Sequence, residues 1–403
     1  MEVLPFEILL DILSRIDDPT SLYNLLLASP AASRVFDHDG LQLTRALFTK
    51  DNTCDQSWET ISLMAMIDSC TLPYPNLDAF VAGFIHDTIR QLRLPRIGEP
   101  LSTSRPLPHG LPDNAPVSTI RRVLSIHAQI SHLTVACLEH YLEIFNALRP
   151  ENAADPEVRY STHPKSTQPW RQRFEGVKAP VSNYGSPTWE EEQRVSRALW
   201  RIQSFYDLCT AASQSRLGWP AEDVVRLQGM KARDLFVKWD LQYEAEEIQT
   251  VTEYLDYTRA TKLVIPYDSY DSSSASKPRR LPWLRHPVEQ WWPTRRRPDP
   301  HPITQLYEID YATFGLRQIQ LLAEWRASPL RTVKFDSYRR LGFALWCHKR
   351  VQAIGLAPLN LNLPGGINLS LWHFAWRSIL DPREVEEVET RLQKEWEERE
   401  LKG

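Results

Sequence analysis

Residues 1–36 read MEVLPFEILLDILSRIDDPTSLYNLLLASPAASRVF, and this stretch predicts three short helices joined by two capped turns. Each turn places an N-cap residue before a proline that suits the first helical position, Asp18 before Pro19 and Ser29 before Pro30. Apolar side chains occupy nearly every side of these helices. A unit below about 40 residues seldom holds a core by itself, so we expect a partner groove to cover the surplus apolar face.

The pattern of these residues resembles the F-box, which has an LPxEI opening, an apolar helix, a D-P-x-x-L-x-x-L stretch and a closing aromatic residue. The matching residues are Leu4, Pro5, Glu7, Ile8, Asp18, Pro19, Leu22, Leu25 and Phe36, in under a tenth of the chain. The third helix departs from the family, which often has basic residues and a tryptophan where this chain has Ser33, Arg34 and Val35. The same residues also fit a capped helix pair of an ordinary helical domain.

The resemblance implies docking onto the Skp-type adaptor of a cullin–RING (SCF-type) ubiquitin ligase, with the rest of the chain recruiting a target protein. It assigns to the adaptor contact, or to the core of the docking unit, the residues Leu4, Pro5, Ile8, Ile12, Leu13, Leu22, Leu25 and Phe36. Spacing does not separate inward from outward positions, because nearly every side is apolar. The chain would then be a non-catalytic substrate adaptor. A second hypothesis is an F-box scaffold that acts outside ubiquitylation, in transcription or trafficking.

Length and composition limit the classes of protein to consider. The chain has 403 residues, 42% of them hydrophobic, and its net charge of -4 argues against a protein that coats nucleic acid or an anionic membrane. Five scattered cysteines are typical of reduced thiols in an intracellular protein of the cytoplasm or nucleus. Apolar runs are broken by charge before the length of about 18 residues that a membrane span needs, so we expect no membrane span. The sequence does not open with a cationic stretch followed by an apolar run and a cleavage site, so we expect no secretory signal.

Apolar residues at helical spacing predict a mostly helical body after the F-box, so the expected fold class is all-α. Helices are expected over residues 41–48, 57–70, 76–94, 118–148, 190–214, 222–239, 241–264, 304–326, 335–354 and 370–380, and from 382 onward. Residues 359–369, LNLNLPGGINL, predict one small hairpin or a turn. No repeat with a period of 20–50 residues is present, which excludes leucine-rich and WD-type target-binding modules.

Three proline-rich stretches, near residues 93–117, 149–187 and 266–302, are expected to be long loops. We therefore expect an F-box at 1–40 and an irregular target-recognition domain at 41–403, which these loops can subdivide. This layout, and stretches such as EEQRVSRALWRIQSFYDL, are similar to divergent fungal F-box proteins, in which a helical domain of unassigned target follows the F-box.

Residues 277–302 read KPRRLPWLRHPVEQWWPTRRRPDPHP and combine cationic with indole side chains. Guanidinium and indole groups together bind phosphate, stack on bases or recognise acidic peptides. Candidate residues for a surface that binds the target or an acidic ligand are Arg279, Arg280, Trp283, Trp291, Trp292, Arg295, Arg296 and Arg297. Two other interpretations stay open: a loop folded over the body with buried tryptophans, and a nuclear-import signal.

The sequence lacks the common catalytic and metal-binding motifs. It contains no G-x-S-x-G elbow, Walker loop, G-x-G-x-x-G or H-E-x-x-H, so we expect no catalytic residue, metal or cofactor. Cys137 and His140 can share a helix face, but no second ligand pair accompanies them. Cys137 lies in an apolar stripe, which favours a core thiol. A helical enzyme is the third hypothesis, and a deep pocket with convergent polar groups would support it.

Overall fold

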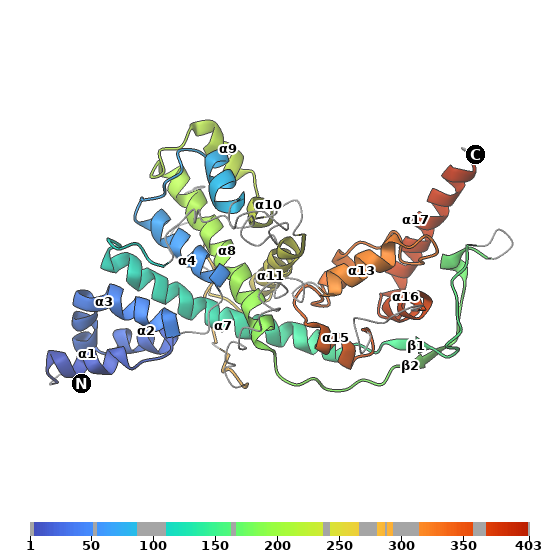
Figure 1. Ribbon diagram of the computed structural model, residues 1–403, viewed down its shortest axis with the longest axis horizontal. Helices are drawn as coiled ribbons and strands as arrows, with labels where there is room; N and C mark the ends of the chain where they lie inside the picture. Colours follow the sequence, from blue (N-terminus) through green and yellow to red (C-terminus); the bar gives the residue numbers. More distant parts are fainter. Residues whose placement is uncertain are drawn as a thin grey trace, which may run out of the picture. The chain divides into compact units, whose positions relative to one another are not determined.

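The computed structural model describes residues 4–50, 55–86, 110–162, 167–236, 242–265, 280–286, 288–292, 314–357 and 368–401. Of these residues 64% are helical and 3% lie in strands, which confirms the all-α fold class. The chain divides into two compact units. Figure 1 shows its helices and strands, coloured along the sequence. Unit 1 comprises Met1–Leu138 and Glu192–Leu306, and unit 2 comprises Glu139–Glu191 and Tyr307–Gly403.

Unit 1 is built from helices. They are α1 (Phe6–Ser14), α2 (Pro19–Ala28), α3 (Pro30–Lys50), α4 (Asp55–Asp68), α5 (Leu77–Phe80), the π-helical turn η1 (Val81–His86), most of α7 (Val117–Ala147) and α8 (Trp189–Ser213), α9 (Ala221–Gln228), α10 (Ala232–Phe236) and α11 (Gln242–Ala260). The core of the unit lies among α4, α7, α8 and α11, where Ile61, Leu124, Trp200 and Ile248 are fully buried. Burial of these apolar side chains is the main force that stabilises the unit.

Unit 2 contains the remaining elements. They are β1 (Glu151–Ala153), the 3-10 turn η2 (Pro169–Arg171), β2 (Gly176–Lys178), α13 (Phe314–Glu324), α14 (Asp336–Arg339), α15 (His348–Ala353), α16 (Leu369–Ser378) and α17 (Pro382–Glu400). Strand β1 pairs antiparallel with β2, so that Asn152 lies opposite Val177. The core is aromatic: the ring of Trp376 lies 4.8 Å from that of Phe343 and 5.3 Å from that of Tyr338.

Most expected helices are present, and three expectations are corrected. The helix expected over residues 41–48 is the continuation of α3. Gly40 lies inside α3, and a Cβ there would lie 2.8 Å from the buried ring of Phe36, so the glycine makes room for that ring. The segments 222–239 and 335–354 each form two short helices instead of one. Gly342 interrupts the second of them with a φ of +82°, a left-handed conformation that ends a helix.

The expected loops are confirmed only in part. The stretch 149–187 contains β1, η2 and β2, and strands of three residues are too short to show alternation in the sequence. Residues 93–109 and 266–279 lie outside the described residues. Residues 359–367, which make up most of the possible hairpin, also lie outside them. No helix within the described ranges is both long and apolar enough to cross a membrane.

Candidate docking surface and binding pocket

The first three helices, here called the N-terminal segment (residues 4–50), pack α1 and α2 each against α3. Side chains buried in this packing are Leu9, Leu13, Leu22, Leu26, Val35 and Phe36. Both expected N-caps are confirmed. The Asp18 carboxylate accepts hydrogen bonds from the backbone N–H groups of Thr20 and Ser21, at 3.3 and 2.6 Å. The Ser29 hydroxyl oxygen accepts one from the backbone N–H of Ala32 at 3.2 Å.

One side of the N-terminal segment is covered by α7 of the same unit (Figure 1). Arg121 of α7 donates to the carboxylate of Asp37 at 2.7 Å, and its guanidinium lies 5.3 Å from the ring centroid of Phe36. The hydroxyl of Ser125, also on α7, donates to the hydroxyl of Tyr23 at 3.2 Å. The chain itself thus covers part of the apolar surface for which the sequence suggested a separate partner.

Another part of the segment leaves apolar side chains exposed at the start of α1. Leu4, Phe6 and Ile8 are 40%, 41% and 50% exposed, and Pro5 between them is also exposed. We call Leu4, Pro5, Phe6 and Ile8 the N-terminal apolar face. Four neighbouring apolar residues with this much exposed surface are typical of an interaction surface, whereas scattered single ones are not.

The structure separates the eight residues that the sequence assigned to the docking unit. Leu13, Leu22 and Phe36 are buried in the segment and stabilise it. Ile12 and Leu25 are half-buried, and Leu4, Pro5 and Ile8 are exposed. Sequence reasoning missed Phe6, the variable position of the LPxEI pattern, although its neighbours on both sides carried the signal.

The described part of the Arg/Trp stretch packs on unit 1. Trp292 is buried, and its indole N–H donates to the carboxylate of Glu192 at 2.5 Å. The backbone N–H of Leu281 donates to the side-chain oxygen of Gln203 at 3.1 Å. Trp291 is 59% exposed and meets the Trp292 ring edge-on at 4.8 Å. Residues 281–286 and 288–292 therefore fit the interpretation of a loop folded over the body, although Trp292 is the one tryptophan that they bury.

The remaining residues of that stretch differ in accessibility. Arg280 is exposed and Trp283 is half-buried, whereas Arg279, Arg295, Arg296 and Arg297 lie outside the described residues. Among the described members of the candidate surface, Arg280 and Trp291 are exposed, whereas Trp292 is buried in the fold.

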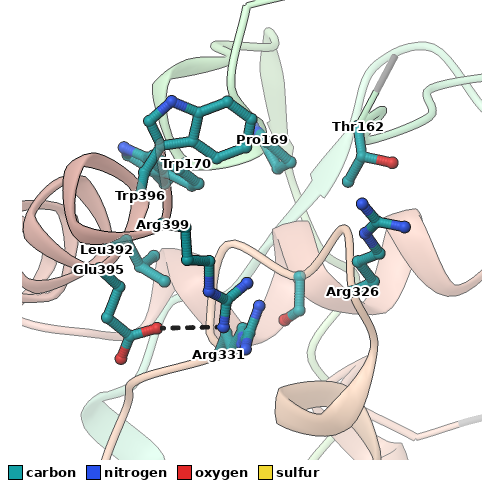
Figure 2. A pocket seen from close by; sticks show the side chains of 10 residues that line it. Thr162, Pro169, Trp170, Arg326, Arg331, Leu392, Glu395, Trp396 and Arg399 are labelled. Carbon is teal, nitrogen blue, oxygen red and sulfur yellow. Dashed lines mark ion pairs between the residues drawn. The ribbon is translucent and has the colours of Figure 1, made fainter. Parts of the chain in front are cut away.

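Unit 2 contains a pocket of about 270 Å³ that the sequence did not predict. Its wall combines two indoles, three guanidinium groups and one carboxylate, from Trp170, Trp396, Arg326, Arg331, Arg399 and Glu395. Figure 2 shows Arg331 and Arg399 near Glu395, and Arg326 near Thr162. These residues come from three segments far apart in the sequence, so no local spacing reveals them.

The Cys137 thiol is a core group, as expected. It is fully buried, and burial raises its pKa well above the usual value for a thiol. His140 is half-buried beside Tyr141, and burial lowers its pKa. Within the described ranges no group of three or more His, Cys, Asp or Glu side chains is placed to hold a metal ion.

His373 is a buried histidine in the core of unit 2. Its ring stacks on that of Trp325 with centroids 5.0 Å apart, and its Nε2 lies 3.0 Å from the backbone oxygen of Leu322. Burial lowers the pKa of His373 to about 4, although the hydrogen bond to Leu322 opposes this change. The imidazole is therefore neutral in the folded chain at pH 7.

Acid is expected to destabilise the chain through His373. The folded pKa of about 4 lies below the ordinary 6.5, so the unfolded state binds more protons between these values. The free energy of unfolding should therefore fall as the pH drops from 6.5 towards 4, with a loss of about 2 kcal/mol at pH 5 from this group. Urea unfolding at pH 7 and 5 measures it. His373→Gln, which cannot titrate, should lose that much less between the two pH values, and an equal loss in both proteins would contradict the prediction.

In the comparisons with known proteins, no family model, no curated protein and no solved structure matches the chain. The assignment of function therefore depends on the residues and surfaces described above.

Proposed function

We propose that this chain is the substrate-recognition adaptor of an SCF-type ubiquitin ligase. In this proposal the N-terminal segment binds a Skp-type adaptor and, through it, a cullin, while the helical regions beyond it hold a target protein. The observation that carries the proposal is the N-terminal apolar face, which stays exposed at the start of a segment that resembles the F-box. The chain itself performs no chemistry; it brings the lysines of the target close to ubiquitin carried by another subunit.

The N-terminal segment has a buried side that stabilises it and an exposed side that is free to bind the adaptor, which supports the proposal. Buried residues such as Leu13 and Leu22, together with the contacts of Arg121, stabilise the segment on unit 1 before any partner binds. The apolar face is therefore already formed in the free chain. Binding a partner then carries no free-energy cost of folding the segment, which favours affinity.

The size of the apolar face sets a limit on its contribution. Fully burying one large apolar side chain contributes about 1.5–3 kcal/mol, and Leu4, Phe6 and Ile8 are already about half covered. Together they supply on the order of 3 kcal/mol, below the roughly 8 kcal/mol of a micromolar complex. The interface must therefore extend beyond these residues, and Leu27 of α2, which is 68% exposed, is the next candidate.

Co-purification of the full chain with a Skp-type adaptor tests the proposal. Replacing Leu4 and Pro5 by alanine should clearly lower recovery of the adaptor, because both side chains are exposed in the free chain and would be buried in the complex. The circular dichroism and thermal midpoint of the chain should not change. The matched control is Val225→Ala, which truncates another exposed apolar residue of unit 1, 69% exposed, and should leave recovery unchanged.

The outcomes separate the hypotheses. Undiminished recovery of the adaptor with the Leu4 and Pro5 variant would contradict the proposal. Recovery of the adaptor without a cullin would instead favour a scaffold outside ubiquitylation. A co-purified protein whose cellular lifetime rises when residues 1–40 are deleted would identify the target.

A further inference from the structure

We propose that the pocket of unit 2 binds a phosphate monoester carried on a flat apolar group. The proposal goes beyond the function proposed above and does not depend on the N-terminal segment. It is based on the charge of the pocket, its indole wall and the contacts that hold this wall in place.

The charge of the pocket matches a dianion. Three guanidinium groups, those of Arg326, Arg331 and Arg399, face one carboxylate, Glu395, which lies 4.0 Å from Arg399. Neither Arg326 nor Arg331 forms an ion pair among the residues that the structure describes. Three positive charges less one negative charge leave two, and a phosphate monoester carries about -1.5 to -2 at pH 7. A single carboxylate ligand would neutralise only one of them.

The same three arginines also line an adjoining, shallower hollow of about 650 Å³, which has Glu324 in its wall. Glu324 does not line the pocket itself. Glu324 is exposed and lines only the hollow, so the lining of the pocket keeps its excess of positive charge. Guanidinium groups suit this ligand because their planar N–H donors match two phosphate oxygens at once.

The apolar part of the wall fits the group that carries the phosphate. The rings of Trp170 and Trp396 meet at 63° with centroids 6.0 Å apart, and Pro169 and Leu392 lie beside them in the lining. Flat indole faces attract aromatic rings. A volume of about 270 Å³ is below the usual range for drug-sized ligands, so one phosphorylated ring fits and a dinucleotide does not.

Contacts behind the pocket hold the indole wall in place. The backbone oxygen of Trp170 accepts hydrogen bonds from Arg173 at 2.7 Å and from Arg377 at 3.2 Å. Arg173 and Arg377 both pair with the carboxylate of Glu389 on α17, the helix that carries Trp396 and Arg399. This network fixes η2 against α17, so the two sides of the pocket are positioned before a ligand enters.

Phenyl phosphate is the probe that tests the proposal, by isothermal titration calorimetry with the full chain. Arg331→Gln and Arg326→Gln should each weaken binding about tenfold or more, because each removes charge-assisted hydrogen bonds to the phosphate. Trp396→Leu should weaken phenyl phosphate and leave the affinity for inorganic phosphate unchanged. The matched control is Arg391→Gln, an exposed arginine on α17 outside the pocket, which should leave the affinity unchanged.

Two further ligands distinguish the source of the phosphate monoester. A short peptide with one phosphotyrosine between neutral residues tests a protein side chain, and phenyl phosphate tests a free small molecule. Tighter binding of the peptide would identify a phosphorylated protein as the ligand, and exclusion of the peptide would identify a small molecule. Absence of binding for both, or equal weakening by Arg391→Gln and Arg331→Gln, would overturn the proposal. The thermal midpoints of the variants should not change, because Arg326 is exposed and Arg331 is half-buried. Unchanged midpoints would exclude misfolding as the cause of weaker binding.

Discussion

Replacing Arg350 by leucine is expected to lower the free energy of unfolding of the chain by about 3–5 kcal/mol, because it leaves a buried carboxylate without its partner. The side chains of Arg350 and Glu191 are 2% and 0% exposed. Two hydrogen bonds join them: Nε to Oε1 at 2.9 Å and Nη2 to Oε2 at 2.8 Å. Such a bidentate pair is among the stronger charge-assisted contacts.

The surroundings of Arg350 explain why the loss should be large. Its guanidinium also donates to the backbone oxygens of Gly185 at 3.0 Å and Ser186 at 2.9 Å. The rings of Tyr184 and Trp346 lie 5.0 and 5.2 Å from it. A leucine offers none of these donors, so two backbone oxygens also lose their hydrogen bonds.

The pH dependence gives this prediction a second readout. Burial alone would raise the pKa of Glu191, but the hydrogen bonds and charge of Arg350, with the backbone N–H groups of Cys347 and Thr188, outweigh it and hold that pKa below its usual value. The pair therefore stabilises the folded chain above the ordinary pKa of 4.5, and this stabilisation is lost as the pH falls through the folded pKa. Without Arg350, only the backbone N–H groups of Thr188 and Cys347 oppose the effect of burial, so Glu191 takes up a proton at higher pH. The deficit of the variant should therefore shrink between pH 7 and pH 5.

Urea unfolding followed by circular dichroism measures the deficit. The matched control is Arg159→Leu, which removes the exposed ion pair between Arg159 and Glu157 of the same unit, whose charged groups lie 3.5 Å apart. This substitution should lower the free energy of unfolding by less than about 1 kcal/mol. The double variant Glu191→Leu with Arg350→Leu should recover part of the loss, since no unpaired charge remains. A deficit for Arg350→Leu as small as that for Arg159→Leu would contradict the argument.

This ion pair also shows where sequence reasoning ends. The periodic apolar stripes predicted α7 and α8, and Glu191 lies in the first turn of α8, where an acidic residue is ordinary. Arg350 lay inside a helix predicted over 335–354. Nothing in either local pattern indicates that these residues, 159 positions apart, share one buried contact. Partners this distant are set by tertiary packing, which spacing along one helix does not encode.

The same reason explains the pocket and the docking surface. The pocket brings together residues near 170, 326–331 and 395–399, so its charge is visible only after folding. The N-terminal pattern was visible, but it did not show which side faces outward, because apolar residues surround α1 and α2. The position of α7 decides this, since it covers the side near Phe36 and leaves the start of α1 open.

Replacing Ile8 by aspartate is expected to weaken binding of the chain to a Skp-type adaptor by about a hundredfold or more. In the proposed complex the new carboxylate would be buried without a partner, and a hundredfold loss corresponds to only about 2.7 kcal/mol, well within the cost of burying an unpaired charge. The free chain should remain folded, because Ile8 is 50% exposed. An acidic residue in the first turn of α1 also complements the helix dipole, so the free energy of unfolding should change by less than about 0.5 kcal/mol.

Calorimetric titration of the purified adaptor into each variant measures this effect. Leu321→Asp, which places the same charge on an apolar residue of α13 that is 55% exposed, should bind the adaptor like the unchanged chain. Leu9→Asp should instead unfold the N-terminal segment, because Leu9 is 3% exposed and packs inward. Loss of the adaptor with Ile8→Asp in a fully folded chain therefore distinguishes a docking surface from a core defect. Equal binding by Ile8→Asp and Leu321→Asp would contradict the proposed function. The proposal of a phosphate pocket in unit 2 would not be affected, because it does not depend on the N-terminal segment.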